Sequence, residues 1–235
     1  MSETLTRRAL RAYFPSGGLR RRVVPLPEHG LVYVKNPKAG SSTLMVWLHR
    51  LHSGDPAADP EHMHRDHQLP SMHEVGRDQV LRMLSGDAYR FSFVRNPVRR
   101  LESVYRGKIC RHHSFRRRVA PTLGLPPDPS EPVSFEQFLA AVERQDPLTE
   151  MDPHWRPQHL NLLHPLVSLD CVGRLESFEA DLERIRLEAG LPRMPADTKN
   201  AAPARQTADS VYDGRPDLRR RVETLFAVDM ELYGY

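Results

Sequence analysis

The stretch "LVYVKNPKAGSST", from Leu31 to Thr43, decides the fold. Its first four residues are apolar and favour extended structure, which predicts a buried strand over Leu31–Val34. Asn36 and Pro37 end this run, and apolar residues then recur at i, i+3, i+4 and i+7, which predicts a helix. The apolar stripe of that helix consists of Leu44, Trp47, Leu48 and Leu51. The stretch therefore predicts a strand, a tight turn and a helix.

The turn between this strand and helix has the composition of an anion site. Main-chain N–H groups at a helix start point towards a common position, and the hydroxyls of Ser41, Ser42 and Thr43 would add further donors. Lys38 would bring a compact positive charge to the same position. The alternative is a capped helix that carries a solvated lysine, because short motifs also occur by chance.

The turn differs from the loop that binds nucleoside triphosphates. That loop has the pattern G-x-x-x-x-G-K-[ST], whereas here Gly40 is the only glycine and Lys38 precedes it. No second strand ends in an acidic residue placed to hold Mg²⁺. The sequence therefore favours a metal-free anion site over a kinase or an NTPase.

A second strand-to-helix junction follows at "YRFSFVRNPVRRLESVYRGK". Tyr89–Val94 is predicted to be a strand that Arg95 closes, and Asn96-Pro97 supplies an N-cap and a proline at the first helical position. On the helix that follows, a basic face can hold a second anion, although a solvated arginine face is the common alternative. This face consists of Arg99, Ser103 and Arg106.

The rest of the chain completes an α/β pattern. "PLVSLDCVGRL" predicts a third strand region, and a helix from Phe178 should end at Gly190. A last helix is expected from Asp217 to Leu232. Strands that alternate with helices indicate a parallel sheet covered by helices, in a single domain over residues 1–235. Residues 1–27 are interpreted as an N-terminal extension and residues 119–133 as an exposed, proline-rich loop.

Composition limits the class of protein. The 235 residues are 39% hydrophobic and 27% charged, with a net charge of +4, which predicts a soluble globular protein that can accept an anionic partner. No apolar run has membrane length, and "MSETLTRRAL" lacks the apolar core of a signal peptide, so we expect a cytoplasmic protein without a membrane span. Cys110 and Cys171 do not make a disulfide scaffold.

Together the two junctions resemble the sulfotransferases that use 3′-phosphoadenosine 5′-phosphosulfate (PAPS), and in particular the carbohydrate group of chondroitin 4-O, dermatan 4-O and HNK-1 enzymes. In that family, "PK-[small]-[small]-[ST]" binds the 5′-phosphosulfate and "FVR-x-P-x-x-R-[LI]-x-S-x-[YF]-R-x-K" binds the 3′-phosphate. The first motif is matched by Pro37, Lys38, Ala39, Gly40, Ser41, Ser42 and Thr43. The second is matched by Phe93, Val94, Arg95, Pro97, Arg100, Leu101, Ser103, Tyr105, Arg106 and Lys108.

Further segments extend the likeness from about Leu31 to Tyr235. "DPHWRPQ" (Asp152–Gln158) resembles the group's D-x-H-W-x-P-Q, "DCVGRLESFEADL" resembles "DFVGKLETLEEDA", and "FAVDMELYGY" resembles a D-x-x-x-F-G-Y ending. The resemblance implies a P-loop-NTPase-like fold, in which a central parallel sheet is flanked by helices. The eukaryotic enzymes are Golgi membrane proteins with an N-terminal span and disulfides, so this chain is expected to be a soluble bacterial-type member.

The resemblance also implies roles for residues. PAPS would be the sulfuryl donor, the Pro37–Thr43 loop would hold its 5′ end, and Lys38 would stabilise charge on the departing phosphate. Arg95 and Ser103 would hold the 3′-phosphate. A late polar loop with Lys199 and Arg205 would close over the nucleotide. The acceptor wall would consist of His154, Trp155 and Arg156, for which a packed loop anchor is the alternative.

The acceptor hydroxyl needs a base, and "HMHRDHQLPSMH" offers several histidines. His64 is the first candidate, because it resembles the family's H-x-x-x-x-L stretch, and His67 is the second. A solvated loop is one alternative. A zinc site is another, because His-x-His-x-x-His can bind metal. No cysteine or acid stands at a clear ligand spacing, so no metal is predicted.

Two other function classes compete with the sulfotransferase. A P-loop kinase of a small metabolite would need ATP and Mg²⁺. A non-enzymatic nucleic-acid-binding protein would use residues 95–118, which contain nine Lys and Arg residues and only one acidic residue, Glu102. This stretch has few aromatic residues for stacking. The resemblance therefore implies a metal-independent sulfotransferase that acts on a hydroxyl of a carbohydrate or glycosylated acceptor, and no nucleic-acid partner is expected.

Overall fold

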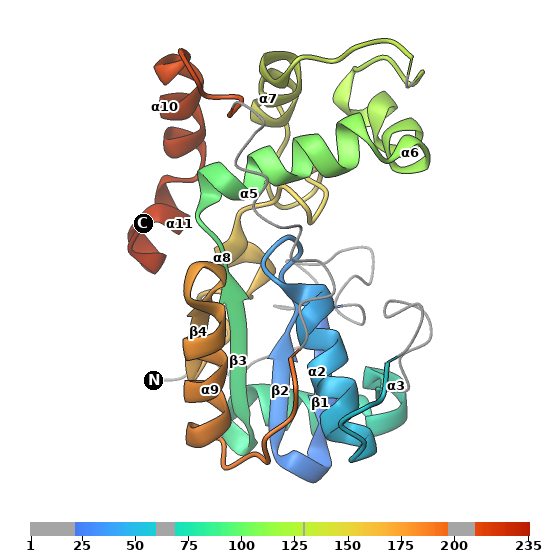
Figure 1. Cartoon of the computed structure of the whole chain (residues 1–235), viewed down its shortest axis with the longest axis vertical. Helices are drawn as coiled ribbons and strands as arrows, with labels where there is room; N and C mark the ends of the chain where they lie inside the picture. Colours follow the sequence, from blue (N-terminus) through green and yellow to red (C-terminus); the bar gives the residue numbers. More distant parts are fainter. Residues whose placement is uncertain (1–21, 60–68, 129, 197–209) are drawn as a thin grey trace. The chain divides into compact units, whose positions relative to one another are not determined.

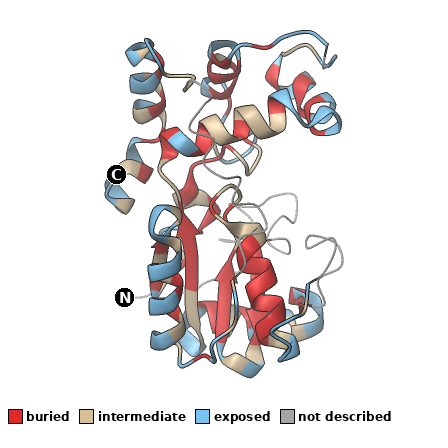
Figure 2. Cartoon of the chain, viewed as in Figure 1, coloured by how far each residue is buried: buried red, intermediate tan, exposed pale blue. Residues whose placement is uncertain are grey.

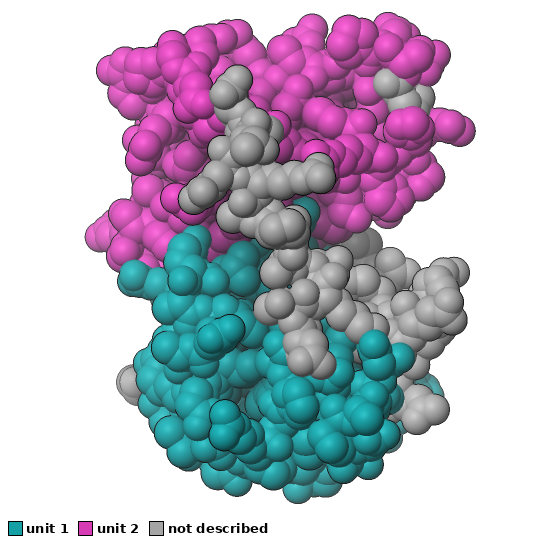
Figure 3. Space-filling model, viewed as in Figure 1, with its two compact units in different colours: residues 1–94, 161–204 teal, residues 95–160, 205–235 magenta. Residues whose placement is uncertain are grey.

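The computed structural model describes residues 22–59, 69–128, 130–196 and 210–235. The chain forms two compact units, which Figure 3 colours separately. Unit 1 comprises residues 1–94 and 161–204, and unit 2 comprises residues 95–160 and 205–235. Figure 1 labels the strands and most of the α-helices of both units.

Unit 1 is built on a four-stranded sheet in the order β1-β2-β3-β4. The strands are β1 (Val23–Leu26), β2 (Leu31–Val34), β3 (Tyr89–Val94) and β4 (Cys171–Arg174). β2, β3 and β4 run parallel, which confirms the α/β class, and β1 pairs antiparallel with β2. The carboxyl ends of the parallel strands therefore share one edge of the sheet, where α/β proteins bind ligands.

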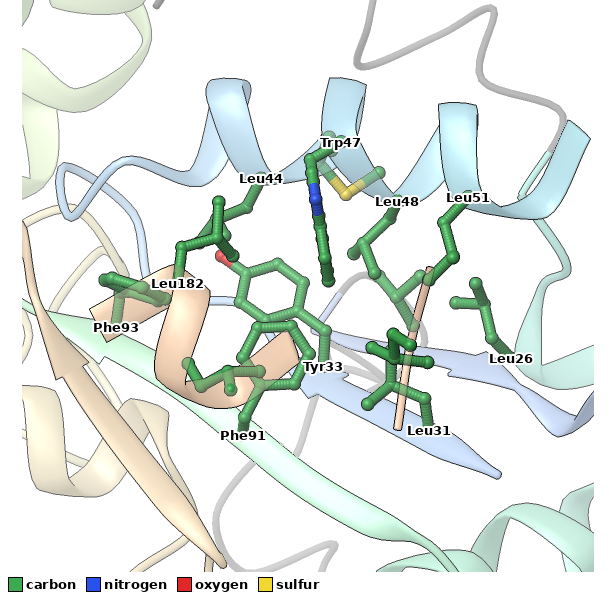
Figure 4. Close-up of a cluster of buried hydrophobic side chains, with 14 of the residues drawn as sticks. Leu26, Leu31, Tyr33, Leu44, Trp47, Leu48, Leu51, Phe91, Phe93 and Leu182 are labelled. Carbon is green, nitrogen blue, oxygen red and sulfur yellow. The ribbon is translucent and has the colours of Figure 1, made fainter. Parts of the chain in front are cut away.

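The helices of unit 1 connect these strands. Their bounds are η2 (Pro27–His29), α2 (Ser41–Ser53), α3 (Met72–Val75), α4 (Arg77–Arg82), η3 (Met83–Asp87), η5 (Leu175–Ser177) and α9 (Phe178–Glu188). α2 and α9 cover the same face of the sheet (Figures 1 and 4). α2 is buried from Thr43 to Leu51, well beyond its apolar stripe (Figure 2).

Aromatic rings fill the space between α2, α9 and the sheet. Tyr33 and Phe91 stack with ring centroids 5.2 Å apart. The ring of Trp47 meets Phe91 edge-on at 6.2 Å. Trp47 is only 1% exposed, as expected for a residue of the apolar stripe (Figure 4). Truncation of a ring packed in this way costs about 3–5 kcal/mol of folding free energy.

Unit 2 is helical. Its elements are α5 (Pro97–Val104), the π-helical η4 (Tyr105–Cys110), α6 (His113–Leu123), α7 (Phe135–Glu143), α8 (Gln158–Asn161, which ends at the boundary with unit 1), α10 (Pro216–Leu225) and α11 (Ala227–Tyr233). Asn96 caps α5 by accepting hydrogen bonds from the N–H groups of Val98 and Arg99, as predicted. A second apolar cluster, which includes Phe138 and Trp155, forms the core of this unit.

The structure corrects two segments near proline residues. Residues 1–27 are not all an extension, because Val23–Leu26 forms β1. Pro25 is tolerated there because β1 is an edge strand, where a missing N–H need not break a ladder. Residues 119–133 are not all loop, because α6 continues to Leu123 through Pro121. Burial of Val119 and Leu123 holds these turns in place.

The expected last helix is also two helices. α10 and α11 are separated at Phe226, whose dihedral angles of φ −112° and ψ 26° are not helical. The break lets the side chain of Phe226 enter the apolar core of unit 2. It also leaves Asp229 fully buried on α11.

Candidate functional site

The first junction is a main-chain cradle at the start of α2. Lys38 and Gly40 both adopt left-handed conformations, with φ of 69° and 77°. Such residues turn successive N–H groups towards one position, and the first N–H groups of a helix lack intrahelical partners. A Cβ atom on Gly40 would lie only 3.1 Å from Leu175 and 3.2 Å from Phe178. Position 40 therefore favours glycine both for its conformation and for its space.

The side chains of this loop divide into two groups. Ala39 is fully buried and Thr43 is 6% exposed, so Ala39 offers a ligand only its main chain. The other members of the loop are partly exposed, and they are Pro37, Lys38, Gly40, Ser41 and Ser42. Lysine and hydroxyl groups are thus presented at the surface beside the helix start.

Buried polar side chains join the ends of β2 and β3. Asn36 is fully buried, and its Nδ2 donates a hydrogen bond to the carbonyl oxygen of Phe93 at 3.0 Å. Ser92 Oγ donates to the carbonyl oxygen of Val34 at 2.6 Å. Asn161 Nδ2 in turn donates to Asn36 Oδ1 at 3.3 Å. The sequence indicated only that Asn36 ends a strand, whereas the structure shows that it fixes the strand end from which the cradle begins.

Lys35 is a charged residue of this junction that sequence reasoning did not single out. Burial and, to a smaller extent, the positive charge of Arg22 together lower the pKa of the Lys35 ammonium to about 8. The main chain of Lys35 extends the pairing of β1 with β2, because its N–H donates to the carbonyl oxygen of Arg22 at 2.6 Å. The junction therefore holds two lysines, of which Lys35 releases its proton more easily than usual.

The second junction begins where β3 ends. Arg95 follows Val94 directly, and the carboxamide of Gln158 binds its main chain on both sides. Ser103 is partly exposed and Arg99 is exposed on α5. Arg106 lies in the π-helical turn after α5 and forms an ion pair with Glu102 at 2.9 Å.

The "DPHWRPQ" segment is anchored to α5. Arg100 is buried, and its guanidinium donates to the carbonyl oxygens of Arg156 at 2.9 Å and Pro153 at 3.0 Å. Trp155 is 1% exposed, and its indole N–H donates to Gln145 Oε1 at 2.7 Å. Arg156 is 3% exposed. This burial favours packing roles for Trp155 and Arg156, and it leaves His154 as the accessible member of the expected acceptor wall.

His154 forms a pair with Asp152. His154 Nδ1 lies 2.6 Å from Asp152 Oδ1, and the His154 side chain remains 25% exposed. Burial lowers the pKa of His154 and outweighs the opposing effect of Asp152. Burial alone would raise the pKa of Asp152, but hydrogen bonds from His154 and the charge of Arg118 lower it. A carboxylate thus holds a neutral imidazole near pH 7, an arrangement suited to accepting a proton.

The candidate bases His64 and His67 lie outside the described residues, as do Lys199 and Arg205 of the late polar loop. Within the described ranges, no group of three His, Cys, Asp or Glu side chains is arranged to hold a metal ion. No helix in the described part of the chain combines the length and apolarity needed to cross a bilayer.

Unit 1 also contains a pocket that sequence reasoning missed. Its volume is about 320 Å³, which is within the range of about 300–1,000 Å³ typical of ligand pockets. Aromatic, apolar and charged side chains line it, including Trp47, Phe178, Glu179, Leu182, Arg193 and Met194. Phe178 is also the ring that crowds Gly40, so the pocket adjoins the cradle. The sequence pattern predicted only that a helix begins at Phe178.

Comparison with known proteins matches this chain to sulfotransferases. The sequence model described as "Sulfotransferase family" matches residues 21–235. Mouse carbohydrate sulfotransferase 14 is 32% identical over 117 residues, covering 46% of this chain and 31% of the relative. Mouse carbohydrate sulfotransferase 12 is 27% identical over 248 residues, covering 88% of this chain and 58% of the relative. The matches thus span about a third to three fifths of these relatives. No solved structure gives a significant match.

Proposed function

Because the chain belongs to the sulfotransferase family, we propose that it moves a sulfuryl group from PAPS to a hydroxyl of a carbohydrate acceptor. The observation that carries the proposal is the cradle from Lys38 to Thr43, which presents main-chain donors and a lysine beside the carboxyl end of β2. In the reaction, the acceptor oxygen bonds to sulfur and the bond from sulfur to the bridging oxygen breaks. The hydroxyl proton passes to a base, and 3′,5′-adenosine bisphosphate leaves.

The first junction would hold the reacting end of the donor. Main-chain N–H groups of Gly40 to Thr43, with the hydroxyls of Ser41 and Ser42, would bind the 5′-phosphosulfate. Lys38 would stabilise negative charge on the bridging oxygen as the phosphate departs. The transferring sulfuryl group carries less charge than a phosphoryl group, so fixed protein charges are sufficient and no metal is proposed.

The remainder of the nucleotide would contact other elements. Arg95 and Ser103 would bind the 3′-phosphate, and Lys199 and Arg205 would close over the nucleotide. Adenine would enter the pocket beside Gly40, because this pocket offers the partly exposed ring of Phe178 and adjoins the loop that would hold the 5′-phosphate.

The acceptor would meet a basic surface near His154. The Lys108 ammonium and the Arg118 guanidinium lie 5.0 and 4.8 Å from the ring centre of Phe115. The ring of His154 lies 5.0 Å from the same ring. These cations favour an acceptor with anionic or strongly polar sugars. His64, with His67 as the second candidate, is proposed as the base that takes the acceptor proton.

A ligand screen by thermal denaturation tests this function. 3′,5′-Adenosine bisphosphate should raise the melting temperature without metal, since a ligand that binds only the folded state stabilises it. 5′-AMP should raise it much less, because it lacks the 3′-phosphate. A larger shift with ATP and Mg²⁺ would instead support a kinase, and salt-sensitive stabilisation by duplex DNA alone would support a nucleic-acid-binding protein. PAPS-dependent sulfation of a panel of neutral and uronic-acid-containing glycans would then identify the acceptor.

A further inference from the structure

Gln158 forms an unusual contact with the main chain of Arg95. Gln158 is fully buried, and its Oε1 accepts a hydrogen bond from the N–H of Arg95 at 3.0 Å. Its Nε2 donates to the carbonyl oxygen of Arg95 at 2.8 Å. One carboxamide therefore binds both main-chain polar groups of a residue that lies 63 positions earlier in the chain.

This contact replaces the sheet ladder where β3 ends. β3 pairs with β4 as far as Val94 and Arg174, and Arg95 is the next residue. Buried main-chain groups need partners, and the Gln158 carboxamide supplies them in the manner of a neighbouring strand. Because it fixes the peptide planes on both sides of Arg95, it also fixes the direction of the bond from Cα to Cβ. The side chain of Arg95 therefore leaves the main chain in a fixed direction.

Asp229 holds Gln158 in turn. Asp229 is fully buried on α11, and its Oδ2 accepts a hydrogen bond from the N–H of Gln158 at 2.6 Å. Its Oδ1 accepts from the N–H of His159 at 2.9 Å and contacts His159 Nδ1 at 2.7 Å. A carboxylate from the end of the chain thus caps α8, whose first residue binds Arg95.

We propose that Gln158 and Asp229 are positioning residues that hold Arg95 ready to bind the 3′-phosphate of the nucleotide. The proposal rests on the proposed function, because it takes Arg95 as the ligand of that phosphate. It gives "DPHWRPQ" and the C-terminal "FAVDMELYGY" a common purpose, since one supplies Gln158 and the other Asp229. Neither side chain needs to touch the nucleotide.

If Gln158 positions Arg95, its loss should weaken only the binding of the 3′-phosphate. If it merely stabilises the fold, its loss should not discriminate between nucleotides with and without that phosphate. Gln158→Met keeps the size of the side chain but removes both hydrogen bonds to Arg95. We expect its affinity for 3′,5′-adenosine bisphosphate to fall roughly 10–100-fold, by analogy with the loss of a partner that orients a metal ligand. Its affinity for 5′-AMP should not change. Calorimetric titration of this chain with both nucleotides measures the ratio of its affinity for 3′,5′-adenosine bisphosphate to its affinity for 5′-AMP.

Gln145→Met is the matched control. Gln145 is also a buried glutamine of unit 2, but its Oε1 accepts from the indole of Trp155 and not from Arg95. It should lower the melting temperature and leave the ratio of the two affinities unchanged. If Gln158→Met folds poorly, Gln158→Glu provides the same test, because it keeps an acceptor for the Arg95 N–H and loses the donor to the Arg95 carbonyl. Asp229→Asn should also lower the ratio.

A double-mutant cycle with Arg95→Gln separates the two proposals. Arg95→Gln should abolish the preference for the 3′-phosphate, and Gln158→Met should then lower the ratio no further. If Arg95→Gln keeps the preference, the assignment of the 3′-phosphate to Arg95 is wrong. If Arg95→Gln loses the preference but folded Gln158→Met and Gln158→Glu both keep it, the nucleotide assignment survives and the positioning role is refuted.

Discussion

The two strand-to-helix junctions achieve their geometry in different ways. At the first, which follows β2, local backbone conformation determines the shape, because Lys38 and Gly40 both have positive φ and α2 begins immediately afterwards. At the second, which follows β3, distant side chains determine it, because Gln158 holds Arg95 and Asp229 holds Gln158. The backbone shape of the first cradle therefore depends mainly on a few consecutive residues, although Asn36 at its start is tied to Phe93 and Asn161. The second junction depends on three separated segments.

This difference indicates that the two junctions have different functions. A main-chain cradle offers several weak donors around one position, which suits a phosphosulfate that must change its charge during reaction. An arginine whose main chain is held by a buried amide offers one strong cation from a fixed position, which suits a phosphate that only has to be bound. Substitutions at the first junction should consequently affect turnover, and substitutions at the second should affect nucleotide affinity.

The largest expected effect concerns His64, the proposed general base. Neither junction is proposed to take the acceptor proton, so neither could replace it. His64→Ala should lower kcat roughly 10²–10⁴-fold, the usual contribution of a general base, and leave nucleotide affinity unchanged. Initial rates across pH should show an ionisation in the wild type that the variant lacks.

His154 is the control for this assignment. If His64→Ala and His67→Ala both retain activity while His154→Gln loses it, the base belongs to the Asp152–His154 pair. The inflection of the rate should then lie below the ordinary histidine value of 6.5, because burial lowers the pKa of His154.

Loss of the lysine side chain at the first junction is the next largest effect. Lys38→Ala should lower kcat roughly 10²–10³-fold, the range for one preorganised electrostatic donor. Affinity for 3′,5′-adenosine bisphosphate should change much less, because the lysine acts on charge that develops during the reaction. Single-turnover kinetics and calorimetry measure the two quantities.

Lys38→Gly serves as the paired variant. Lys38 has a φ of 69°, a conformation that glycine adopts without strain. Lys38→Gly should match the kcat of Lys38→Ala and exceed it in thermal stability. Near wild-type turnover in both variants would show that Lys38 has no role in charge stabilisation.

The sequence predicted features that depend on neighbouring residues and missed features that depend on distant ones. The Pro37–Thr43 loop and the cap at Asn96 depend on neighbouring residues, so their types and spacing predicted the helix starts. The clamp on Arg95 could not be predicted, because no local pattern connects a glutamine and an aspartate 71 residues apart. Strand β1 was missed for a related reason, since Val23–Leu26 becomes a strand only by pairing with β2.

A smaller effect is expected from Gly40→Ala, which tests whether the first cradle depends on backbone conformation. The left-handed conformation costs a residue with a side chain about 1–2 kcal/mol, and the added methyl group would crowd Leu175 and Phe178. Gly54→Ala is the matched control at the other end of α2, because its φ is 70° and no atom lies within 4 Å of the added carbon. Denaturant titration should show the larger loss for Gly40→Ala, together with weaker binding of 5′-AMP. Equal losses of stability and unchanged binding would contradict the cradle.

The smallest effect concerns Lys35, which precedes the cradle. Its pKa of about 8 in the folded protein lies below its ordinary value of 10.5, so the unfolded chain binds more protons between these two pH values. Stability should therefore rise with pH across this window, because the folded state has already lost the proton that the unfolded state still holds. The rise should be less than about 1 kcal/mol, since Lys35 is partly exposed and solvent screens its charge. Lys35→Met should reduce this rise in denaturant titrations at pH 8 to 10. Burial also lowers the pKa of Lys108, so Lys108→Met should reduce the rise as well, and the double variant should reduce it further than either single variant. An unchanged rise in Lys35→Met would assign the proton to other groups, and the first junction would then be defined by Lys38 and its backbone alone.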